Sequence, residues 1–106
     1  GLSLDEAEQR IRVAVAAEPR NFAYIDSLAW VYYRQGRFAE ALDQILLALR
    51  SIPDEPDPVI LDHAGDICAA TDLTRLARHY WQAALDAEIP KPEPVRAKLH
   101  GHTASP

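Results

Sequence analysis

The sequence predicts an all-α protein built from antiparallel helix-turn-helix repeats. Apolar residues recur at spacings of three and four along most of the 106 residues, which is the pattern of helices that bury one face. The pattern also returns after 34 residues, a period typical of repeated helical pairs. The residues that recur are Ala7, Ile11, Ala14 and Pro19, followed by Ala41, Ile45, Ala48 and Pro53.

The first two helices have recognisable start and stop signals. Residues 2–17 are predicted to form a helix that has Ser3 as its N-cap and Glu6 completing a capping box. Pro19 ends this helix, because proline cannot continue the hydrogen-bond ladder. A second helix is predicted over residues 21–35, capped by Asn21. Gly36 then supplies the left-handed residue that helix C-termini favour.

Three further helices and a short C-terminal stub follow. The third helix is predicted over residues 38–51, the fourth over 58–70 with Pro58 in its first turn, and the fifth over 73–87 with Thr71 or Asp72 as its cap. Residues 53–58 contain three prolines and are predicted to form a rigid connector. Residues 95–100 have room for one short last helix. The third helix is expected to bury Phe38, Ala41, Leu42, Ile45, Ala48 and Leu49.

The repeated positions have packing roles. A third copy of the pattern contains Ala77, Trp81 and Ala84, at a spacing of 36. Small residues allow paired helices to approach closely, and large ones fill the space between successive pairs. The aromatic residues expected in this packing are Tyr24, Tyr32, Phe38, Tyr80 and Trp81.

The pattern Ile25-x2-Leu28-Ala29-x2-Tyr32, followed by Ala41-x3-Ile45, Ala48 and Pro53, resembles the tetratricopeptide repeat (TPR) signature. Ile25 stands in place of the signature's tryptophan and Ala29 in place of its glycine. Residues 26–37 and 62–66 resemble the C-terminal repeats of bacterial multi-TPR proteins, which are often exported or lipid-anchored. The resemblance implies a short right-handed TPR superhelix from a bacterial protein, and it leaves cytoplasm and envelope both open.

The resemblance implies a single TPR domain over residues 1–100. We expect a half repeat at 2–19, full repeats at 22–55 and 58–91, a partial cap at 92–100, and a flexible tail at 101–106. The abrupt start at Gly1 suggests a fragment of a longer protein. Asp72 stands where the first full repeat has Gly36, so a less typical turn is expected in the second.

Composition argues against several function classes. A net charge of −5 disfavours nucleic-acid binding, which needs a basic face. No run of about twenty apolar residues is present, so this segment is not expected to insert into a membrane. Cys68 is the single cysteine, so it has no partner for an internal disulfide or a zinc site and is expected to be a buried thiol.

The resemblance implies that the first helix of each pair lines a concave groove. Aromatic and acidic residues there suit a peptide with an apolar anchor and basic flanks. In the alternative interpretation, Trp30 packs against a neighbouring helix and the acidic residues are merely solvated. The predicted groove residues are Asp26, Ser27, Trp30, Tyr33 and Arg34 from the first full repeat, and Val59, Asp62, His63 and Asp66 from the second.

The charge of these residues also bears on the partner. TPR domains that clamp the acidic C-terminal tail of a chaperone use lysine, arginine and asparagine in the groove. This sequence has aspartates and no lysine among the predicted groove residues, which disfavours that activity.

No catalytic, cofactor or metal site is predicted, and the chain is not expected to be an enzyme. Asp62, His63 and Asp66 could hold a divalent metal, but no second histidine stands at a suitable spacing. The sequence therefore predicts a protein-interaction scaffold that binds a protein or peptide. The alternatives are a capping or self-association role through the N-terminal half repeat, and a metal-dependent activity at those three residues.

Overall fold

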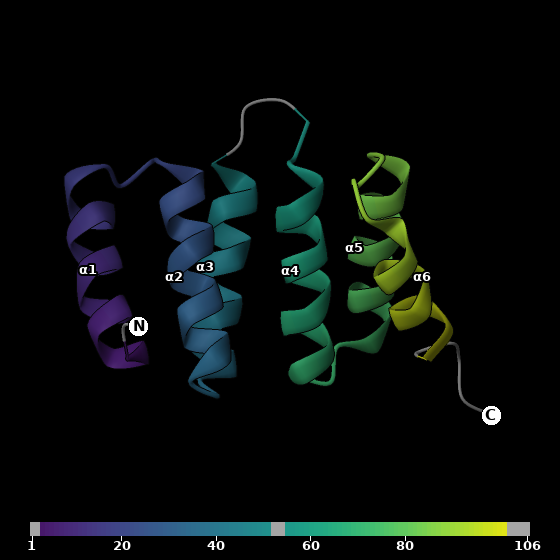
Figure 1. The fold of residues 1–106 in the computed structure, drawn as a ribbon, viewed down its shortest axis with the longest axis horizontal. Helices are drawn as coiled ribbons and strands as arrows, with labels where there is room; N and C mark the ends of the chain where they lie inside the picture. Colours follow the sequence, from purple (N-terminus) through teal and green to yellow (C-terminus); the bar gives the residue numbers. More distant parts are fainter. Residues whose placement is uncertain (1–2, 52–54, 102–106) are drawn as a thin grey trace. The chain divides into compact units, whose positions relative to one another are not determined.

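The computed structural model describes residues 3–51 and 55–101, and every regular element in these ranges is a helix (Figure 1). This confirms the predicted all-α repeat fold of helix-turn-helix pairs. The helices are α1 (Leu4–Ala17), α2 (Phe22–Arg34), α3 (Phe38–Arg50), α4 (Pro58–Ala70), α5 (Thr74–Asp86) and α6 (Pro92–Gly101).

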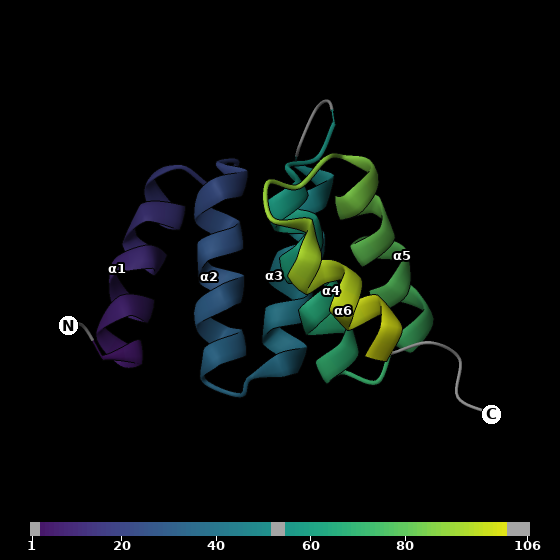
Figure 2. The ribbon, with the colours of Figure 1, turned by 45° about the vertical axis from the view of Figure 1, so that its right-hand side comes forward.

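The chain divides into two compact units at the loop between α3 and α4. The first unit covers Gly1–Glu55 and holds α1, α2 and α3; the second covers Pro56–Pro106 and holds α4, α5 and α6. The helices α2 and α3 form one antiparallel pair, and α4 and α5 form another; α1 packs on α2, and α6 packs on α5 (Figures 1 and 2). The prediction of a single domain over residues 1–100 stays a prediction.

Three helices begin at side chains that cap their free N–H groups. Ser3 accepts a hydrogen bond from the Glu6 N–H at 3.1 Å, and Asn21 accepts one from the Tyr24 N–H at 3.1 Å, as predicted. Asp57 accepts from the Val59 N–H at 2.8 Å, with Pro58 in the first turn of α4. These contacts satisfy donors that an isolated helix start would leave unpaired.

The predicted cap of α5 is wrong. Its N-cap residue is Leu73, which makes no side-chain capping bond. Thr71 serves the preceding helix instead, because its hydroxyl donates to the Ile67 and Cys68 carbonyls at 3.1 and 2.9 Å.

Three helices end in the same left-handed turn. In α2, Gly36 has a φ of 79°, its N–H donates to the Tyr33 carbonyl, and the Arg37 N–H donates to the Tyr32 carbonyl. This is the Schellman arrangement. Asp72 (φ 62°) and Glu88 (φ 60°) make the same turn after α4 and α5. The second repeat's turn therefore has the geometry of the first, although Asp72 replaces glycine.

Small residues let the two helices of each pair approach closely. Ala29 on α2, Ala41 on α3 and Ala77 on α5 are fully buried, and Gly65 on α4 is buried. Trp81 is only 1% exposed, and a Cβ built at Gly65 would overlap its indole ring. Glycine at position 65 is therefore required by the tryptophan, and the predicted core role of Trp81 is confirmed.

The prediction that Phe38 is buried is wrong. Phe38 is 37% exposed, because it begins α3 at the end of the pair; its ring packs at a tilt of 54° on Tyr33, at 5.6 Å between centroids. Among the other aromatic residues, Tyr32 is buried, whereas Tyr24 and Tyr80 are half-buried. Pro53, counted among the repeat residues, lies outside the described residues.

The C-terminal helix α6 is longer than predicted. It has ten residues, Pro92–Gly101, where the sequence indicated a helix over residues 95–100 and a tail from 101. Pro92 follows Pro58 by 34 residues, and Val95 follows Leu61 by the same interval; Val95 and Leu61 are both buried. The helix therefore has the register of the first helix of a repeat. Residues 102–106 of the predicted tail lie outside the described residues.

Candidate functional site

The predicted groove residues of the first unit share one side of α2. Trp30 and Tyr33 stack with ring centroids 4.8 Å apart and planes 17° from parallel, and both side chains are half-buried. Asp26 is half-buried nearby in the helix, whereas Ser27 and Arg34 are exposed. The structure thus places an acidic residue, Asp26, beside the stacked aromatic pair, because Asp26 lies one helical turn before Trp30.

A polar network occupies another side of α2 and was missed by the sequence analysis. The Arg12 guanidinium on α1 donates to the Tyr32 hydroxyl at 2.7 Å. The Arg37 guanidinium lies over the Tyr32 ring, 4.4 Å from its centroid, and donates to Glu8 at 2.8 Å. Gln35 also donates to Glu8, at 3.1 Å. These contacts tie α1 to the turn between α2 and α3.

The network shifts the pKa of its acidic members. The hydrogen bond from Gln35, and then those from Arg12 and Arg37, lower the pKa of Glu8 and outweigh its partial desolvation. The hydrogen bond from Arg37 likewise lowers the pKa of Glu40, which accepts from Arg37 at 2.7 Å. Glu8, Arg37 and Glu40 are therefore charged at neutral pH, and the network is a structural contact between α1 and the α2–α3 pair.

In the second unit, a lysine holds two of the predicted groove residues. Lys98 Nζ on α6 donates to Asp62 at 2.9 Å and to Asp66 at 3.1 Å. Asp66 also accepts from the Trp81 indole N–H at 3.1 Å. Lys98 lies outside the predicted groove set, and the sequence analysis did not place a lysine beside these two aspartates. The pairing joins residues 36 and 32 positions apart, which a motif search along one helix cannot find.

Burial and pairing compete in this cluster. Desolvation raises the pKa of Asp66, and the hydrogen bond from Lys98 opposes it. Desolvation disfavours the charged form of Lys98, but its hydrogen bonds to Asp62 and Asp66 prevail and raise the pKa of Lys98. The Asp62 and Asp66 side chains are 20% and 15% exposed, so Asp62 remains the more accessible acid.

A pocket of about 330 Å³ opens beside Asp62. Val59 and Asp62 from α4 line one part of it, and both were predicted groove residues. The segment before α6 and the first turn of that helix supply the rest. The lining is mostly apolar, with Asp62 and Lys91 as its charged members. The residues that line it are Val59, Asp62, Ile89, Pro90, Lys91 and Pro94.

The acidic residues do not assemble into a metal-binding group. In the described ranges, no set of three or more histidine, cysteine, aspartate or glutamate side chains lies close enough to hold a metal ion. Asp62 and Asp66 instead face the Lys98 ammonium, and His63 is half-buried on the same helix. No described helix is long and apolar enough to cross a membrane.

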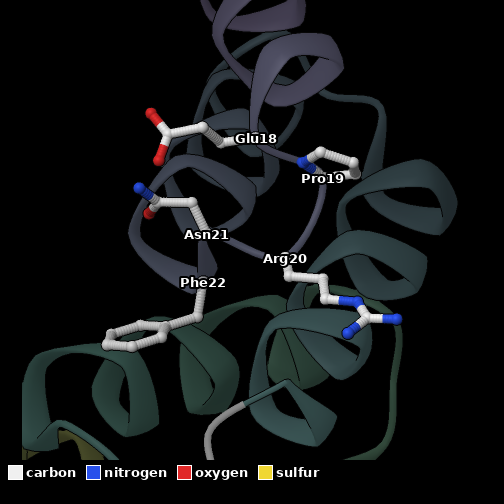
Figure 3. Close-up of a pocket in the computed structure, with 5 residues that line it drawn as sticks. All are labelled: Glu18, Pro19, Arg20, Asn21 and Phe22. Atoms are coloured by element: carbon white, nitrogen blue, oxygen red, sulfur yellow. The ribbon is translucent and has the colours of Figure 1, made fainter.

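A second depression lies at the loop between α1 and α2 (Figure 3). Glu18 and Asn21 point to one side of this loop, and Arg20 points to the other. None of its residues belongs to the predicted groove set. The residues that line it are Glu18, Pro19, Arg20, Asn21 and Phe22.

Comparison with known proteins defines the fold class. No family model matches the chain, and no curated protein sequence matches it. Among solved structures, it is similar to the first TPR domain of Spaghetti (RPAP3), solved bound to the HSP90 peptide SRMEEVD. The TM-score is 0.84 at 21% identity, and the match covers 93% of this chain and 76% of that one. The chain therefore has the tetratricopeptide repeat fold.

Proposed function

We propose that this chain is a protein-interaction module that binds a peptide segment of a partner. The observation that carries the proposal is the pocket of about 330 Å³ in the second unit, where the predicted residues Val59 and Asp62 line the wall. Val59 is 44% exposed, so an apolar side chain in the pocket would cover it. The TPR domain of RPAP3, which has the same fold, was solved with a bound peptide.

The pocket chemistry favours an apolar anchor followed by a basic or polar residue. In the described part of the chain, Asp62 accepts from Lys98 through Oδ1, and its Oδ2 accepts no hydrogen bond. A partner's lysine or arginine at the pocket rim would supply a charge-assisted bond to Oδ2. Lys91 also lines the pocket, from the segment before α6, so the basic residue must approach from the Asp62 side.

The stacked pair Trp30 and Tyr33 is the proposed second contact surface, in the first unit. Aromatic side chains bury a large area at low entropic cost and are enriched at interfaces. Asp26 adds a negative charge, and Ser27 and Arg34 are exposed on the same helix. His63 and Asp66 complete the proposed set in the second unit, where Asp66 acts by holding Lys98.

Selection from a library of displayed peptides would test this proposal. We expect enrichment of sequences that carry an apolar residue next to lysine or arginine. Val59→Glu and Asp62→Asn should each weaken the selected peptide about tenfold or more in fluorescence anisotropy. Leu73→Ala is the matched control, since Leu73 is 41% exposed on the same unit and lies outside the pocket.

The result would contradict the proposal if no consensus emerged or if Leu73→Ala weakened binding as much as Val59→Glu. The peptide SRMEEVD provides a further probe. Equal affinity for this acidic peptide and for the selected one would show that the ligand does not need a basic residue.

Self-association through α1 is a second candidate function. This helix contains no buried residue, and Val13 and Leu4 on it are 71% and 38% exposed. Apolar side chains left open in this way favour a helical neighbour. Light scattering should then show a dimer or larger species that Val13→Glu dissociates; a monomer at all concentrations would exclude this function for the chain as it stands.

A further inference from the structure

A third, basic pocket lies between α5 and α6. It has a volume of about 310 Å³ and belongs entirely to the second unit. Two arginines, a histidine and a glutamine surround two leucines there, in a chain whose net charge is −5. None of these residues belongs to the predicted groove set. The residues that line it are Arg78, Gln82, Leu85, Arg96, Leu99 and His100.

This pocket faces away from the Lys98 cluster. Arg96 and His100 are four residues apart and share one side of α6. Lys98 is two residues from each, which places it about 200° around the helix from Arg96 at 3.6 residues per turn. The two sites therefore use opposite sides of α6. A ligand in the basic pocket does not disturb the contacts of Lys98 with Asp62 and Asp66.

The arginines in this pocket have no ion-pair partner in the described part of the chain. In the described ranges, neither Arg78 nor Arg96 makes an ion pair or a side-chain hydrogen bond. The Nε of Arg78 is buried and has no hydrogen-bond partner among the described residues. The acidic residue on the same helix, Asp86, accepts from Gln82 at 3.0 Å instead. A buried donor of a charged group is costly to leave unpaired, which points to a ligand that accepts from it.

A carboxylate fits the donors better than other acceptors do. A guanidinium presents parallel N–H groups, including Nε–H, that match the two oxygens of a carboxylate or a phosphate. Leu85 and Leu99 add apolar surface to the lining of the pocket. A carbon chain attached to the anion would cover these leucines, whereas an inorganic phosphate has no such chain.

We propose that the pocket between α5 and α6 binds a carboxylate on a short aliphatic chain, held by Arg78 and Arg96 over Leu85 and Leu99. The carboxylate comes either from a free dicarboxylic acid or from an acidic side chain of a peptide. The chemistry of recognition is the same for both sources, and the experiment separates them.

The Nε–Hε signals of arginine in ¹⁵N NMR spectra report directly on this site. We expect glutarate, or the dipeptide acetyl-Glu-Glu-amide, to shift the Arg78 signal and to saturate it below about 10 mM. Tighter binding of the dipeptide would assign the site to a peptide, and tighter binding of glutarate would assign it to a free acid. Arg96→Gln should weaken the better ligand about tenfold.

Arg75→Gln is the matched control, because Arg75 is an exposed arginine of α5 outside the pocket. Its affinity should equal that of the wild type, and backbone amide spectra should show that both variants fold. A linear, unsaturated shift, an equal shift produced by sodium chloride, or an equal loss in Arg75→Gln would overturn the proposal. Inorganic phosphate binding as tightly as both carboxylates would also overturn it.

Discussion

Gly65 and Trp81 are in close contact in the second unit. The indole ring lies where the Cβ of any other residue at position 65 would be, and its N–H donates to Asp66 on the same helix as Gly65. Close packing of this kind leaves no room for a methyl group at position 65. The absence of a Cβ at Gly65 therefore allows α4 and α5 to approach this closely.

Gly65→Ala should therefore lower the free energy of unfolding by about 1 to 3 kcal/mol, since the added methyl group forces the indole to move. Urea denaturation followed by tryptophan fluorescence measures this loss. Gly101→Ala is the control, because a Cβ at Gly101 meets nothing within 4 Å. A neutral Gly65→Ala would contradict the packing described for Trp81.

Trp81→Ala tests the other side of the contact. It removes a fully buried side chain and the donor to Asp66, so a loss of about 3 to 5 kcal/mol is expected in the same denaturation experiment, followed by circular dichroism. A loss below about 1 kcal/mol would show that the indole is not part of the core.

Glu8 makes the stability of the first unit depend on pH in the acidic range. Its pKa is below the ordinary 4.5 in the folded chain, so its contribution to stability is present above pH 4.5 and is lost as the pH falls through the folded pKa. The difference in melting temperature between the wild type and Glu8→Gln should be constant near neutral pH and shrink below about pH 4.5. Glu18→Gln, which removes a carboxylate without an ion pair among the described residues, is the control. A difference that grows in acid would contradict this assignment.

At the scale of elements, three helices end in the same turn with three different residues. Gly36 adopts a positive φ without a steric penalty, whereas Asp72 and Glu88 hold their side chains against the following carbonyl. Aspartate tolerates this conformation better than glutamate does, because its short side chain can bond locally. The turn after α5 is therefore the most strained of the three.

Glu88→Gly should raise the free energy of unfolding by about 1 kcal/mol, and Asp72→Gly by less, because glycine removes the left-handed penalty. Gly36→Ala should lower it by about 1 kcal/mol for the same reason. Urea denaturation of the three variants ranks their free energies of unfolding. Stabilisation by Asp72→Gly that exceeded that of Glu88→Gly would contradict this ranking of strain.

The sequence predicted these elements well where the signal is local. Ser3 and Asn21 cap their helices as expected, and five helices lie within two residues of their predicted bounds. Leu73 was missed as the N-cap of α5 because the turn geometry, rather than a polar side chain, sets where this helix begins. Lys98 was missed because its partners lie 32 and 36 residues away, although the 34-residue interval from Pro58 to Pro92 would have revealed the register of α6.

At the scale of the whole molecule, the net charge of −5 acts on any partner before contact. A negative chain attracts basic peptides and repels acidic ones over roughly the Debye length, which is about 30 Å at 0.01 M salt and about 10 Å at 0.1 M. The association rate of a selected basic peptide should therefore fall between these salt concentrations, as measured by stopped-flow fluorescence. A rate independent of salt would show that the apolar anchor alone governs the encounter.

The reactivity of Cys68 can be used to measure local opening of the second unit. It is the one cysteine in the sequence, it is fully buried on α4, and burial raises the pKa of its thiol to about 11. A thiol reagent can reach it only when the structure around α4 opens, because only the exposed thiolate reacts. The rate of its modification in the unaltered protein therefore measures how often the structure around α4 opens.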